Sequence, residues 1–325
     1  MMDLRLLRTT WLPLLMWLIA GVCSAADTPV RLMVVVRGAS GTPEYGKMFD
    51  EWSERWQVAA KVGGCRVVKI GPTEKNNESP TVSDRDVLLK TLSEATNETV
   101  TELWVALLGH GTFDGKTPRF NLRGDDVSSL DLKDALVKRS ELTAVINCST
   151  ASSPFLSDLA AKNRVIITAT KSGSEQNFAR FGEYMSAAIG DASNDLDKDG
   201  QTSLFEAFLM ASRQTKQFYD SDGRLETEHS LLDDNGDGQG IRADWFRGLR
   251  LIKKPERGQA VDGQLAQQFR LMLSARDQQL APEVRRERDE LVRAVMQLRQ
   301  KKAEFASEDE YFQALEKLCL RIAEL

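Results

Sequence analysis

Two patterns of hydrophobic residues alternate along the first two thirds of the chain. Short runs rich in β-branched residues are separated by stretches whose apolar residues lie three or four positions apart. The runs are typical of buried strands, and the stretches are typical of helices with one apolar face. We therefore expect the α/β class, a mostly parallel sheet with helices on both faces. The predicted strands are residues 31–36, 65–70, 103–108, 143–147 and 165–170.

Spacing and start signals predict helices between these strands. Aromatic residues from Tyr45 to Trp56 share one helical face, Ser83 can cap a helix, and Pro154 can open one. Three further helices are predicted at residues 130–137, 178–189 and 204–218.

Residues 256–325 have a different character. Their charges are nearly balanced, they contain no tryptophan, and Ser307 with Glu310 forms a capping box. The apolar residues that follow step by three or four positions, and they are Phe312, Leu315, Cys319 and Ile322. We expect a helical hairpin or coiled-coil arm, whose helices offer a surface for a protein partner.

The first 26 residues have the pattern of a targeting segment. Arg5 and Arg8 precede an apolar run of 12 residues, and Ser24-Ala25-Ala26 follows as a cleavage site. The run is too short to span a bilayer. We predict a signal peptide over residues 1–26, a secreted or periplasmic protein, and no membrane span after signal removal. An uncleaved anchor is the alternative. The main domain then covers residues 27–255.

Composition excludes several classes of protein. The chain is 42% apolar and 28% charged, as in ordinary globular proteins. It has only two histidines, which excludes a multi-histidine metal site. No basic patch with interleaved aromatic residues occurs, so nucleic-acid binding is not expected. After signal removal three cysteines remain, Cys65, Cys148 and Cys319, and this odd number leaves at least one without an internal disulfide partner.

Acidic residues are concentrated in residues 191–244, which hold 13 acidic and 5 basic side chains. Such a local excess requires a cation or a solvated loop. Oxygen-bearing groups recur there at positions 1, 3, 5, 7, 9 and 12 of a calcium loop, with Gly200 at the sharp turn. These residues are Asp195, Asp197, Asp199, Gln201, Ser203 and Glu206. We predict a Ca²⁺ site here, and no organic cofactor.

A weaker copy of the pattern follows 38 residues later, with Gly238 at position 6. Its predicted ligands are Asp233, Asn235, Asp237 and Asp244. A solvated acidic turn is the alternative for both loops, and a pair of calcium loops that folds alone over residues 190–250 is a third hypothesis. His229 is interpreted as a surface or packing residue on a short helix between Leu225 and Leu231.

Two residues suited to acyl transfer follow consecutive predicted strands. His110 comes after residues 103–108, and Cys148 comes after residues 143–147. Consecutive strands are often neighbours, and parallel sheets bind ligands beyond the carboxyl ends of their strands. A histidine beside a thiol generates the thiolate that acyl transfer needs. Taken alone, however, a cysteine that ends an apolar strand is more typical of a small buried hydrophobe.

With these strand ends identified, residues 30–190 resemble the caspase-like cysteine peptidases, and the legumain (asparaginyl endopeptidase) branch is the most similar. The resemblance is carried by Val34-Val35-Val36 with Gly38 and Ser40, Gly109-His110-Gly111, Asn147-Cys148-Ser149, and Ile166-Ile167-Thr168-Ala169-Thr170 with Glu175. It implies a caspase-like fold and a protein or peptide substrate. Cys148 would be the nucleophile, His110 the general acid/base and Glu175 a substrate-binding acid. The amides of Gly111 and Cys148 would form the oxyanion hole.

The resemblance has two departures beside the cysteine. Ile146 stands where legumain has an acid, and Thr150-Ala151 replaces its Ser-Gly. Two hypotheses follow. The leading one is an exported, calcium-binding cysteine endopeptidase with a His-Cys dyad. The alternative is a catalytically inactive, caspase-like calcium-binding scaffold or interaction protein. Thiol reactivity distinguishes them, because a dyad cysteine reacts fast near neutral pH.

Overall fold

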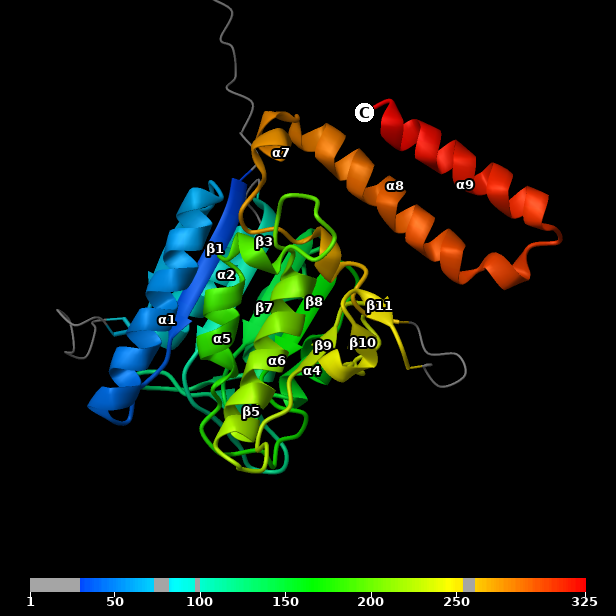
Figure 1. Ribbon diagram of the computed structural model, residues 1–325. Helices are drawn as coiled ribbons and strands as arrows, with labels where there is room; N and C mark the ends of the chain where they lie inside the picture. The colour runs from blue at the N-terminus through cyan, green and yellow to red at the C-terminus, as the bar shows by residue number, and fades with distance from the viewer. Residues whose placement is uncertain (1–29, 73–81, 97–99, 254–260) are drawn as a thin grey trace, which may run out of the picture.

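The computed structural model describes residues 30–72, 82–96, 100–253 and 261–325. The predicted signal peptide, residues 1–26, lies outside these ranges. Figure 1 shows a layered α/β body from which two long helices, α8 and α9, extend.

A six-stranded sheet forms the centre of the body, in the order β2-β1-β3-β7-β8-β9. The first five strands pair in parallel, and β9 is antiparallel to β8. All five predicted strands are therefore present, and the mostly parallel sheet is confirmed. The bounds are β1 Val30–Arg37, β2 Arg66–Ile70, β3 Val100–Leu108, β7 Leu142–Asn147, β8 Arg164–Thr168 and β9 Leu231–Asp233.

Helices cover both faces of the sheet, as expected. One apolar layer contains residues of α1, α5 and α6, and the other contains residues of α2, α3 and α4. Met33 and Val35 of β1 face the first layer, whereas Val34 between them faces the second. Because both faces are buried, the strands are apolar almost throughout. The bounds are α1 Pro43–Val62, α2 Asp84–Ala95, α3 Ser129–Leu136, α4 Pro154–Leu159, α5 Phe181–Ala188 and α6 Leu204–Ser221.

Two small antiparallel sheets are present that the hydrophobic pattern does not predict. One lies just after β3, and the other is a hairpin after β9. Strands of two or three residues are too short to show an alternating pattern. Their bounds are β4 Gly111–Phe113, β5 Pro118–Phe120, β6 Val127–Ser128, β10 Phe246–Arg247 and β11 Arg250–Leu251.

The prediction of a short helix between Leu225 and Leu231 is wrong. Residues 224–230 have no regular structure, and Leu231 begins β9, where it pairs with Thr168 of β8. A helix of this length gains little from local propensity alone. Pairing with β8 instead satisfies backbone groups along an open sheet edge.

The predicted C-terminal helical region is present, and it forms a hairpin. α8 (Pro282–Gln300) and α9 (Glu308–Ala323) run side by side (Figure 1), linked by an Arg321–Glu287 ion pair of 2.6 Å. The first α-helix of this region is α7 (Ala275–Gln279), and the domain boundary at residue 256 stays a prediction. Before α7, Phe269 packs edge-on against Trp104 of β3, with ring centroids 5.3 Å apart. No helix in the described ranges is long and apolar enough to cross a membrane.

Candidate functional site

The predicted catalytic pair lies at the carboxyl edge of the sheet, just after two neighbouring strands. β3 and β7 pair in parallel, ending with Leu107 opposite Asn147. His110 follows β3 by two residues, and Cys148 follows β7 directly. The expectation that these two strands are neighbours is confirmed.

The thiol of Cys148 is enclosed by the apolar layer that contains α1 and α5. The residue has no exposed surface. Gly182 of α5 lies so close that an added Cβ would be 2.9 Å from the Cys148 Cβ and 2.6 Å from the Trp52 ring. Burial, together with the charge of Glu228, raises the pKa of the Cys148 thiol far above its ordinary value. A thiolate is therefore strongly disfavoured at this position.

His110 lies in an aromatic enclosure beside α1. Its ring packs edge-on against Tyr45 and Phe49, with centroid separations of 4.9 and 5.3 Å, and against Phe178 at 5.9 Å. Its Nε2 atom is 3.2 Å from the carbonyl oxygen of Ser40. Within the described ranges, no hydrogen bond joins this ring to the thiol of the predicted nucleophile. The expected base is present at the sheet edge but is not paired with the thiol.

Both amides expected to form the oxyanion hole are hydrogen-bonded within the fold. The Cys148 amide donates to the Leu107 carbonyl oxygen at 2.9 Å. The Gly111 amide donates to the Thr150 hydroxyl oxygen at 3.1 Å. A Cβ added to Gly111 would be 2.6 Å from the Ser149 hydroxyl oxygen. Ser149 and Thr150 contact the histidine loop at Gly111, whereas Cys148 is packed in the core. The catalytic roles assigned to this edge stay predictions.

A histidine–carboxylate pair lies at the same edge, and the sequence gives no signal of it. Glu175, the predicted substrate-binding acid, has its Oε1 atom 2.6 Å from Nδ1 of His229. Its Oε2 atom accepts a hydrogen bond from the His229 amide at 3.2 Å. The other ring nitrogen is 3.6 Å from the carboxylate of Glu226. The packing interpretation of His229 is therefore incomplete. The antiparallel strand β9 places this histidine beside a residue 54 positions earlier, and no local spacing encodes that contact.

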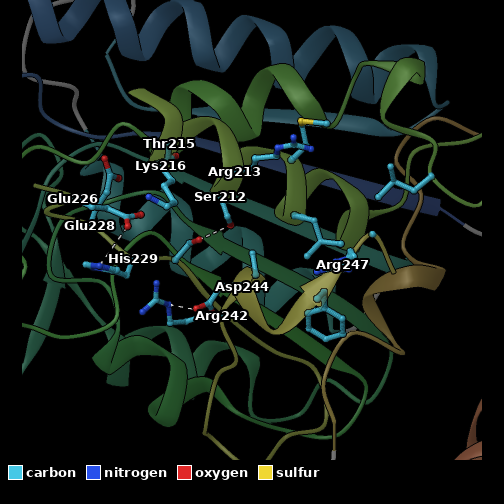
Figure 2. Close-up of a pocket in the computed structure, with 17 residues that line it drawn as sticks. Ser212, Arg213, Thr215, Lys216, Glu226, Glu228, His229, Arg242, Asp244 and Arg247 are labelled. Carbon is cyan, nitrogen blue, oxygen red and sulfur yellow. Dashed lines mark hydrogen bonds and ion pairs between the residues drawn. The ribbon is translucent and has the colours of Figure 1, made fainter. Parts of the chain in front are cut away.

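A pocket of about 460 Å³ opens beside this pair, between α6 and the β10–β11 hairpin. Its volume is in the range of small-molecule sites. Figure 2 shows His229, Glu226 and Glu228 at one end of the pocket and Arg247 at the other. Its basic lining residues are Arg213, Lys216, Arg242 and Arg247. Neither member of the predicted dyad lines this pocket.

Glu228 is buried between this pocket and the start of α5. Its carboxylate accepts hydrogen bonds from the amides of Arg180 and Phe181 and from the hydroxyl of Tyr219. The start of a helix favours a negative charge. Burial nevertheless outweighs these hydrogen bonds and raises the pKa of Glu228 to about 7.

We expect Glu228 to make the calcium-free protein less stable as the pH rises from 5 to 8. Its folded-state pKa of about 7 is above the ordinary value of 4.5, so the native state holds the extra proton. That contribution is fully present below pH 4.5 and is lost as the pH passes 7. The expected loss is about 1 to 3 kcal/mol in the free energy of unfolding. Urea unfolding across this pH range should show a flatter profile for Glu228→Gln. Glu226→Gln serves as the control, and a Glu228→Gln profile as steep as that of the unchanged chain would contradict the assignment.

Residues 195–206 have the geometry expected of the first calcium loop. The carboxylate groups at positions 1, 3 and 5 lie within 4.8 Å of one another, and they belong to Asp195, Asp197 and Asp199. Gly200 at position 6 has a φ of +88°, which glycine adopts without strain. Glu206, in the first turn of α6, reaches back to accept a hydrogen bond from the amide at position 2. Carboxylates around a tight turn are the donor set that Ca²⁺ prefers, so these residues fit the ion.

Like charges crowd this loop. Burial and the charges of Asp199 and Glu206 raise the pKa of Asp197 to about 6. A cation would relieve this repulsion.

The first loop also contacts the base of the arm. Asp199 lies 3.2 Å from the guanidinium of Arg270, which is in turn 3.4 Å from Asp289 of α8. The side-chain amide of Gln201 donates to Asp277 of α7 at 3.1 Å. The loop and the arm therefore share one polar network.

The second predicted loop, residues 233–244, differs from the first at its end. Asp244, expected to close the loop from position 12, is half exposed, and its carboxylate is 2.8 Å from Lys253 and 3.6 Å from Arg242. The chain at this point is a short 3₁₀ turn, Ala243–Trp245, rather than a long helix. The side chain at position 12 therefore does not reach back to the loop, as Glu206 does from the first turn of α6. The structure does not bring Asp244 to the other predicted ligands.

Comparisons with solved structures found caspases among the similar chains. No protein-family model and no curated protein matches the sequence. Caspase-1 of Spodoptera frugiperda is 10% identical over 63% of this chain and 87% of that chain, with a TM-score of 0.41. The Drosophila initiator caspase Dronc is 12% identical over 66% and 82%, with a TM-score of 0.39. The structure of pro-sf-caspase-1 is 9% identical over 63% and 91%, with a TM-score of 0.39. At these identities and TM-scores the likeness assigns no family to this chain, and similarity to the legumain branch stays a prediction.

Proposed function

We propose that this chain is a catalytically inactive, calcium-binding interaction protein that uses a caspase-like α/β domain as its scaffold. The enclosed Cys148 thiol carries the proposal. A nucleophilic cysteine must be accessible and readily ionised, and this thiol is neither. The amides of Cys148 and Gly111 are already hydrogen-bonded, so neither is free to donate to an oxyanion.

The proposed partner surface is the arm. Phe312 and Leu320 of α9 are 52% and 59% exposed. Large apolar side chains on a helix that extends from the body favour docking of another protein. Calcium, bound at residues 195–206, would neutralise the crowded carboxylates at the base of this arm. We further propose that the protein is exported to the periplasm or secreted, because residues 1–26 have the pattern of a signal peptide.

Iodoacetamide labelling tests the proposal, because the described chain has three free thiols. Cys319 is exposed, whereas Cys65 and Cys148 are buried. Labelling followed by peptide mass spectrometry, with and without calcium, should show Cys319 reacting fast and Cys148 reacting no faster than Cys65 at pH 7 to 8. Fast alkylation of Cys148 that His110→Ala slows would overturn the proposal.

A cysteine endopeptidase is the second candidate, favoured by the placement of His110 and Cys148 after adjacent strands. In that mechanism the Cys148 sulfur attacks a peptide carbonyl carbon and His110 protonates the leaving amine. Water then releases the acyl group and regenerates the thiol. A protein or peptide would be the substrate, with Glu175 beside it. Helix α5 would have to move to expose the thiol, so calcium-dependent labelling of Cys148 is the result that would support this candidate.

A further inference from the structure

One carboxylate oxygen of Asp262 is buried and unpaired within the part of the chain that the structure describes. The residue is 2% exposed. Its Oδ1 atom accepts hydrogen bonds from the amides of Asp234 and Asn235 at 3.0 and 3.2 Å. Its Oδ2 atom has no hydrogen-bond partner among the described residues. Buried polar atoms are almost always satisfied, and an unpaired buried charge is costly. The orphaned oxygen therefore needs a partner, which a bound cation would supply.

The two amides that Asp262 binds identify its place in the second loop. They belong to positions 2 and 3 of residues 233–244. In the first loop the amides of positions 2 and 3 donate to Oε1 of Glu206, at 2.6 and 3.4 Å. Glu206 is the closing acid at position 12 of that loop. Asp262 thus stands in the second loop where the closing acid stands in the first.

Positions 1 to 7 of the second loop match those of the first. In both loops the carboxylate at position 1 accepts from the amides at positions 4 and 6. The side chain at position 3 accepts from the amide at position 5, and that at position 5 accepts from the amide at position 7. Positions 4 and 6 have positive φ in both loops: Lys198, Gly200, Gly236 and Gly238. Residues 233–239 therefore already have the backbone form of residues 195–201.

The segment that carries Asp262 is fixed against the loop by a buried carboxylate. Asp234 accepts hydrogen bonds from the amides of Gly263 and Ala266, at 2.9 and 2.8 Å. It is 7% exposed. These bonds hold the returning chain beside the loop, so the closing acid need not lie at position 12 in sequence.

We propose that the second loop binds a hard divalent cation, Ca²⁺, and that Asp262 closes this site in place of Asp244. The inference rests on the calcium binding of the proposed function and adds a second site with a ligand from a separate segment. The ligands from the loop itself are the side chains of Asp233, Asn235 and Asp237. Carboxylate and amide oxygens of this kind are the ligands that Ca²⁺ prefers.

Isothermal titration calorimetry of the purified full chain with calcium chloride tests this site. We expect two bound ions per chain. Asp262→Asn retains an oxygen acceptor for the two loop amides but removes the charge. It should lower the affinity for one ion by at least tenfold or abolish its binding. Asp244→Asn, the matched control at position 12, should leave both ions in place. Glu206→Gln should affect the other ion.

The outcomes separate this inference from the proposed function. If the chain binds no calcium at all, the proposed calcium binding fails. If it binds calcium but Asp262→Asn changes neither ion, or Asp244→Asn weakens one, the assignment of Asp262 is overturned. Circular dichroism and the melting temperature in chelator show whether each variant folds. Should Asp262→Asn not fold, Asp262→Ser, which keeps a smaller oxygen acceptor, replaces it in the same titration.

Discussion

Calcium is expected to raise the melting temperature of this protein, and Glu206→Gln is expected to remove the part of the gain that the first loop contributes. The carboxylates of that loop lie within 4.8 Å of one another in the native state, and an unfolded chain does not hold them together. A ligand that binds the native state at a hundred times its Kd stabilises by about 2.7 kcal/mol per site. For a chain of this size that corresponds to roughly 4 to 5 °C. Calorimetric scans in calcium and in chelator measure the difference.

A matched variant on the same helix controls for charge alone. Asp220 is exposed near the end of α6 and pairs with Lys216, so Asp220→Asn should keep the full calcium effect. Glu206→Gln should also fold in chelator, because glutamine at this position can still complete the capping box with Ser203. Equal calcium shifts in Glu206→Gln and Asp220→Asn would contradict the first site.

Trp52→Ala is expected to lower the free energy of unfolding by about 3 to 5 kcal/mol and to accelerate alkylation of Cys148. Trp52 is 2% exposed and lies, like Cys148, against Gly182 of α5. Removing the indole leaves a large cavity in this layer, next to the thiol. Urea unfolding gives the stability, and labelling at 25 °C without denaturant gives the rate at each cysteine.

Trp104→Ala separates local exposure of the thiol from global unfolding. Trp104 is also fully buried in this layer, but it packs against Phe269 near the middle of β3. Labelling through global unfolding follows the loss of stability and should rise equally in two variants of equal stability. An excess rate at Cys148 in Trp52→Ala therefore reports local opening. Equal rates in both variants would show that Trp52 does not cover the thiol.

Most of the central fold was predictable because its strands are buried on both faces. The five parallel strands are continuous apolar runs, and their order leaves helices to cover both faces. β9 was not predictable, because its three residues gain their structure from pairing with β8. The burial of Phe269 and Leu271 was also not predictable, because it depends on contacts with Trp104 and its neighbours, which lie far away in the sequence.

The candidate site was predictable as far as it depends on strand order and loop spacing. Strand order placed His110 and Cys148 at one edge, and the loop pattern located residues 195–206. Sequence does not show which way a side chain points at the end of a strand. From the sequence, Cys148 could therefore be either an accessible nucleophile or a buried core residue. It also does not show contacts between distant segments. Glu175 with His229, and Asp262 with the second loop, are both of that kind.

Arg270 is shared between Asp199 of the first calcium loop and Asp289 of the arm. In the proposed function, the affinity of this loop for calcium and the position of the hairpin would both depend on the same guanidinium. Linkage between two such equilibria is reciprocal. Whatever factor calcium applies to the affinity of a partner on the arm, that partner applies to the affinity for calcium. A binding partner would then set the calcium concentration at which the loop fills.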